Sequence, residues 1–196
     1  VLTALCWAIC TYAAGRASVK ISSKVLVIFY NIAGAIYFFI ASDFNFDGFT
    51  TKFIIYSVLA GLGHASALSL IGYALSKGRS GVIAPVSTVF EITVPVMVTT
   101  IVIGSLGWLT YFGITILIAS IWLLRKGDDS THETTVLKDI VYGLLIGCGF
   151  GSFISLTSLV DNEFKNNAFF VAMFSSMLLL SILLIISNKK YHISIG

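Results

Sequence analysis

Long stretches without a charged side chain limit this chain to a small set of folds. Residues 1–15, 25–42, 53–76, 80–124 (with only Glu91 inside), 140–160 and 166–188 otherwise lack Asp, Glu, Lys and Arg. A helix needs about 20 mostly apolar residues to cross ~30 Å of hydrocarbon. The fourth stretch is two spans long and divides at Gly104-Ser105, a pair typical of a helix-ending turn. The sequence therefore predicts an all-α integral membrane protein with seven transmembrane helices.

Composition and periodicity exclude the main alternative classes. The chain is 57% hydrophobic and 11% charged, whereas soluble domains are roughly 25% charged. No stretch alternates polar and apolar residues as a transmembrane barrel strand does. The net charge of +3 comes without a basic arm, so nucleic acid is not an expected partner. The lipid bilayer is the expected surrounding, and any function must lie in the helices.

The first stretch is interpreted as a helix rather than as a cleaved signal peptide, because no basic residue precedes it. The chain starts with Val1 and its first span is short. We therefore expect the natural protein to extend further upstream.

The lysines and arginines predict an orientation, because these residues gather in cytoplasmic loops. With seven helices, all of the 12 except Lys52 and Lys165 fall on the side reached after the first, third, fifth and seventh helices. The start of the first helix is therefore expected outside the cell, and the loop after the seventh helix inside.

The middle of the chain carries a family resemblance. Residues 73–85 read Tyr-Ala-Leu-Ser-Lys-Gly-Arg-Ser-Gly-Val-Ile-Ala-Pro, followed by Pro95, by Gly104, by Tyr111-Phe112-Gly113 and by a basic exit at Arg125-Lys126. This region resembles the third to fifth helices of an EamA-like repeat of the drug/metabolite transporter superfamily.

The resemblance implies an organisation and an activity. Residues 1–126 would form one five-helix repeat, 127–139 a polar loop, 140–188 the first two helices of a second repeat, and 189–196 a tail. The family usually has ten helices, so the chain would be a fragment. The resemblance implies a carrier in the plasma membrane that moves a small organic molecule by alternating access, with no cofactor and no enzymatic activity.

Two ionisable residues lie near the middle of predicted spans. His64 is at the centre of the third span, and Glu91 is one position from the centre of the fourth. Such residues cost about 2.5–3.5 kcal/mol on insertion scales and are functional-site hypotheses by default. Because consecutive helices are antiparallel, the two side chains could come within reach of each other.

The neighbours of Glu91 favour a role in substrate binding or proton coupling. Ala84, Ser87, Thr88 and Pro95 fall within about 60° of it on a helix and form a small, polar stripe. Pro95 has no N–H for the carbonyl of Glu91, and transporters bind substrates at interrupted helices of this kind. The alternative is a protonated Glu91 that only packs against a neighbouring helix.

The other candidate residues carry weaker signals. His64 has Ser57, Ala60, Gly61 and Ala67 on its helix face, which fits a tight helix contact as well as a binding site. Arg16 lies in the pore or in the interfacial loop. Trp7, Tyr12, Tyr30 and Asn31 are candidates for a cavity wall, although Trp and Tyr near span ends are often interfacial anchors.

Small residues suggest where helices pack closely. Gly143, Gly147 and Gly151 recur every four residues, and such a ridge lets another helix of the same chain, or of a second copy in a homodimer, approach closely. Cys6 and Cys10 have a spacing that could bind a metal, but no further ligand is near, so packing is favoured and no metal is expected.

Other classes of membrane protein remain as alternatives. The three histidines are scattered over one span, a loop and the tail, which argues against a membrane-embedded enzyme. Neither rings of charge nor a carbonyl filter of a channel is visible. A membrane-embedded sensor or assembly protein stays open.

Overall fold

The computed structural model describes residues 9, 12–13, 16–17, 20–21, 23–42, 49–76, 80–126 and 133–186. It contains the long helices α2 (Ser23–Ala41), α3 (Thr51–Ser76), α4 (Ser80–Ile103), α5 (Trp108–Lys126), α6 (Glu133–Ser158) and α7 (Lys165–Ile186), and a short 3₁₀ turn η1 (Asn162–Phe164). No strand occurs among the described residues. The prediction of an all-helical protein is confirmed for this part of the chain.

Four described helices are long and apolar enough to cross a membrane. Their spans are Thr51–Ala74, Val82–Val102, Leu137–Ser158 and Asn162–Ile186, and two shorter apolar segments are Val25–Ala41 and Trp108–Ala119. The first predicted span lies almost entirely outside the described residues. The structure therefore agrees with an integral membrane protein, and the count of seven helices stays a prediction.

The turn between α4 and α5 is where the sequence predicts it. Gly104 follows the last residue of α4 with a φ of +107°, a left-handed conformation that glycine adopts without a Cβ penalty. The hydroxyl of Tyr111 lies 3.2 Å from Thr100 Oγ1 and accepts a 3.3 Å hydrogen bond from the N–H of Leu106. A glycine and a tyrosine from the next helix thus hold this turn.

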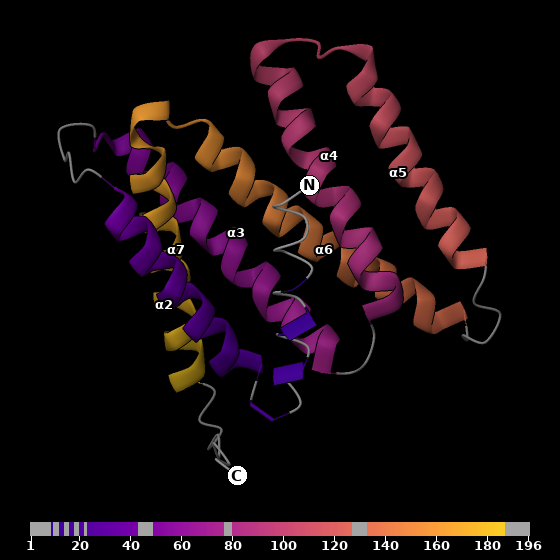
Figure 1. The fold of residues 1–196 in the computed structure, drawn as a ribbon, viewed down its shortest axis with the longest axis horizontal. Helices are drawn as coiled ribbons and strands as arrows, with labels where there is room; N and C mark the ends of the chain where they lie inside the picture. The colour runs from indigo at the N-terminus through magenta and orange to yellow at the C-terminus, as the bar shows by residue number, and fades with distance from the viewer. Residues whose placement is uncertain are drawn as a thin grey trace.

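Helix α6 is the centre of the arrangement. It packs against both α3 and α4, while α7 packs against α2 and α3, and α5 has its main contact with α4 (Figure 1). Helices that precede the polar loop therefore pack directly on helices that follow it. The main core cluster follows this pattern, with Val27, Leu68, Ile83, Ile146, Phe150 and Leu180 buried together.

The helices alternate in direction. The turn between α4 and α5 and the connection between α6 and α7 lie at the same end of the molecule, where α3 also begins (Figure 1). Thr50 starts α3 there, because its Oγ1 accepts a 3.2 Å hydrogen bond from the N–H of Phe53. The side chain of Asn166 donates a 2.8 Å hydrogen bond to the carbonyl of Ala41 and ties the start of α7 to the end of α2.

Candidate functional site

His64 lies in the sealed interior of the group formed by α2, α3, α6 and α7. Its side chain is 2% exposed, and the rings of Phe153 and Phe150 lie 4.5 and 5.7 Å from it, centre to centre. Its Nδ1 is 3.5 Å from the hydroxyl of Ser176 on α7. The imidazole therefore has aromatic neighbours and one weak polar partner.

Asn31 lies near the same level of the group. Phe38 stacks on Phe169, and Gly34 faces Met173. The same antiparallel register of α2 and α7 places Asn31 opposite Ser176. The amide nitrogen of Asn31 donates a 2.8 Å hydrogen bond to the carbonyl of Val27. Its Oδ1 is buried without a hydrogen-bond partner.

Glu91 lies in a different environment on α4. Its side chain is half-buried, and its backbone nitrogen faces Gly147 on α6. Pro95 lies within the same helix, and because proline has no N–H it cannot bond the carbonyl of Glu91. A carboxyl group and a backbone acceptor thus occur together in the middle of the span.

The structure does not bring His64 and Glu91 together. We expected that consecutive helices could place them within reach, but α3 and α4 touch only slightly, and α6 packs on both. The physical reason is the glycine content of α6. Gly149 lies against Gly63 and Ala67 of α3, and Gly147 lies against the backbone of α4. Side chains of these sizes let α6 approach both helices more closely than the two approach each other.

The predicted polar stripe around Glu91 is divided. Ser87 is buried against α6, whereas Thr88 is exposed. Both hydroxyls donate to the carbonyl of Ala84, at 2.9 and 3.0 Å. Because these hydroxyls are already engaged within the helix, Glu91 is the polar group of this stripe best suited to meet a ligand.

The remaining candidates add little to either site. Tyr12 is 69% exposed and Arg16 is also exposed, and no described contact joins either of them to His64 or Glu91. Trp7, Cys6 and Cys10 lie outside the described residues. Cys148 is a free thiol. Within the described ranges, no three His, Cys, Asp or Glu side chains gather in a way that could hold a metal ion.

The glycine ridge of α6 packs within the chain. A Cβ added at Gly143 would lie 2.7 Å from Val86 Cβ, and one added at Gly151 would lie 2.7 Å from Val94 Cβ. Real Cβ atoms do not come this close to a neighbour. The ridge is therefore occupied by α4, one of the two arrangements that the sequence left open.

Sequence reasoning missed Ser176 on α7, whose hydroxyl lies beside His64. Ser176 on α7, Ser57 on α3 and the α6 residues Ser155 and Thr157 are all buried. Ser155 and Thr157 donate to carbonyls of their own helix, and hydroxyl side chains bonded in this way give no strong polar signal in an apolar helix. Their position in mid-span next to small residues was the available signal.

No protein-family model, curated protein or solved structure matches the chain.

Proposed function

We propose that this protein is a membrane carrier of the drug/metabolite type, which moves a small organic molecule by alternating access. The observation that supports this most directly is Glu91, a half-buried carboxyl group in the middle of α4, where Pro95 leaves the carbonyl of Glu91 without its helical N–H partner. In such carriers, substrates and coupling ions bind near the midplane at interrupted helices. The plasma membrane is the proposed location.

The surroundings of Glu91 support contact with a ligand rather than simple packing. The N-terminal half of α4 is buried at Ile83, Val86, Ser87 and Val89, whereas no described side chain from Glu91 to the end of that helix is fully buried. The Glu91 side chain is therefore partly exposed at the surface of the bundle. Proton coupling through Glu91 is the accompanying hypothesis.

The small residues between α4 and α6 support the proposed movement. Gly143, Gly147 and Gly151 let the α4 side chains of Val86, Phe90 and Val94 pack directly on the backbone of α6. Alternating access is largely a rocking of one group of helices against another around a fixed site. The contact between α4 and α6 is the boundary along which we expect this movement.

His64 has a different part in this proposal. Its aromatic contacts and its 2% exposure leave no described route for a solute to reach it. We assign it to the packing of α3 against α6 and α7, and the proposed solute site lies at Glu91.

The test is counterflow in proteoliposomes that contain the full chain. A panel of labelled amino acids, nucleosides and organic cations would be offered, and saturable exchange of any one of them supports a carrier. Leakage without saturation would indicate a channel. The absence of flux for the whole panel would favour a sensor or assembly protein and count against the proposal.

The Glu91→Gln variant then tests the site. Hydrogen bonds to charged groups contribute about 1.5–3 kcal/mol, so counterflow should fall by roughly 10- to 100-fold. The matched control is Thr115→Ala on α5, because Thr115 lies outside the stripe and its hydroxyl bonds to a carbonyl of its own helix. Unchanged counterflow in Glu91→Gln, with normal membrane expression, would refute the role of this residue.

A further inference from the structure

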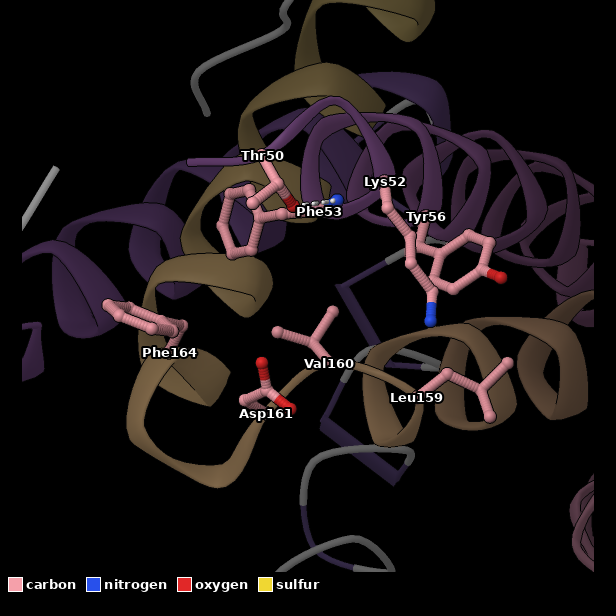
Figure 2. Close-up of a pocket in the computed structure, with 8 residues that line it drawn as sticks. All are labelled: Thr50, Lys52, Phe53, Tyr56, Leu159, Val160, Asp161 and Phe164. Atoms are coloured by element: carbon pink, nitrogen blue, oxygen red, sulfur yellow. Dashed lines mark hydrogen bonds between the residues drawn. The ribbon is translucent and has the colours of Figure 1, made fainter. Parts of the chain in front are cut away.

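A pocket unrelated to Glu91 lies where α3 begins and where α6 is connected to α7 (Figure 2). Its volume is about 170 Å³. Its wall combines Lys52, Phe53 and Tyr56 of α3 with Val160, Asp161 and Phe164 of the connection. A water molecule takes up about 30 Å³, and pockets for drug-sized ligands have roughly 300–1,000 Å³. The pocket therefore fits a small polar group rather than a drug.

The pocket holds two opposite charges apart. The Lys52 ammonium lies 5.5 Å from the centre of the Tyr56 ring, and the Asp161 carboxylate makes no capping hydrogen bond to η1. Figure 2 shows the side chain of Val160 between the two groups. Among the described residues they form no salt bridge with each other. A ligand with both a negative and a positive group can therefore meet each charge with its opposite.

Lys52 belongs to an apolar span, whereas Asp161 belongs to the connection just before one. Lys52 is in the first turn of the span Thr51–Ala74, and its ammonium reaches toward Tyr56, one turn further in. Asp161 lies between the spans Leu137–Ser158 and Asn162–Ile186. In a phospholipid the phosphate is nearer the acyl chains and the headgroup ammonium is further out. This order matches Lys52 in the span and Asp161 in the connection.

We propose that the pocket binds a headgroup that carries a phosphate and a primary ammonium, as in an ethanolamine phospholipid. The phosphate pairs with Lys52, and the ammonium donates hydrogen bonds to Asp161. Lys52 and Asp161 are both exposed, so a headgroup can reach them from outside, and Phe53, Val160 and Phe164 supply apolar contacts in the wall. An anion alone would be repelled by Asp161, and a cation alone would be repelled by Lys52.

Native mass spectrometry of the detergent-purified full chain tests this assignment. The protein would be titrated with ethanolamine, choline and glycerol phospholipids of equal chain length. Retention of the ethanolamine lipid should exceed that of the other two by about fivefold or more. It should fall to their level in Lys52→Gln and in Asp161→Asn.

The controls are Lys165→Gln and Glu163→Gln, which make the same charge changes at the same end of the molecule outside the pocket wall. Their lipid retention should equal that of the unmodified protein. Soluble phosphoethanolamine is added as a competitor. Displacement of the lipid would show that the headgroup alone is recognised, and persistence of the lipid would show that the acyl chains hold it as well. Equal retention of the three lipids, or equal loss in the control variants, would overturn the proposal.

Discussion

Polar side chains of the spans are buried in one region of the molecule and partly exposed in another. In the group formed by α2, α3, α6 and α7, Asn31, His64 and Ser176 are each 2% exposed or less. In the C-terminal half of α4 and in α5, no described side chain is fully buried, and Ile101 is 80% exposed. Figure 1 shows α5 on the outer side of α4, away from α2 and α7. One region is a closed core, and the other presents its side chains to the surroundings.

The difference shows that position in a span does not determine the role of an ionisable residue. His64 and Glu91 are both near the midplane, yet only His64 is enclosed. The number of helices that pack around each residue makes the difference. Helices α2, α6 and α7 surround His64 on α3, whereas Glu91 has α6 on one side of its helix. The comparison can be tested through stability, packing and access.

The largest effect on stability is expected for His64→Ala. The change removes the contacts with Phe150 and Phe153 and leaves the hydroxyl of Ser176 without its partner. Emptying a buried site of this size costs about 2–4 kcal/mol. Thermal unfolding in detergent measures the effect, and Thr88→Ala, at an exposed position, should stay within about 0.5 kcal/mol of the unmodified protein. Equal loss in the two variants would remove the distinction between the regions.

A somewhat smaller loss is expected for Gly147→Val. The added side chain would collide with the carbonyl of Ser87 and with Phe90 Cβ, and overpacking of this kind costs about 1–3 kcal/mol. Gly113 on α5 is the matched control, because an added Cβ there meets no atom within 4 Å. The same unfolding assay should find Gly113→Val close to the unmodified protein. A stable Gly147→Val variant would mean that α4 and α6 do not pack through the ridge.

The smallest expected effect concerns access to the two regions. In a background without Cys6, Cys10 and Cys148, a polar thiol reagent should modify Thr88→Cys roughly tenfold faster than Ser176→Cys, because reaction requires exposure of the thiol. Ile101→Cys distinguishes water from lipid. If Thr88 faces an aqueous cavity and Ile101 faces lipid, the polar reagent should modify Thr88→Cys but not Ile101→Cys. A lipid-soluble maleimide should modify both. Faster reaction at Ser176 would contradict the closed core.

Much of the fold could be predicted because its signals are local. Helix lengths follow from the spacing of charged residues, and the end of α4 follows from Gly104, whose backbone needs a positive φ. The Gly143, Gly147 and Gly151 ridge identified a close helix contact before its partner was known. These features depend on residues that lie within a few turns of each other.

The choice of neighbouring helices could not be predicted in the same way. Each described helix is apolar on most of its circumference, so periodicity does not say which face meets which partner. The prediction that His64 and Glu91 could meet failed for this reason, because α6 packs on both α3 and α4 although α5 precedes it in the chain. The pocket at Lys52 and Asp161 also depends on two segments that are far apart in the chain, with α4, α5 and α6 between them. No local sequence pattern joins them.

The packing of α6 limits the amino-acid substitutions that this helix can accept. Gly143, Gly147 and Gly151 fix one face of the helix against α4, and Gly149 fixes another against α3. The exposed residues Val141, Leu144 and Leu145 form a narrow outer strip. Exchange of one apolar residue for another should be tolerated on this strip and at the exposed positions Leu137 and Ile154. On the two inner faces even a single methyl group would be selected against.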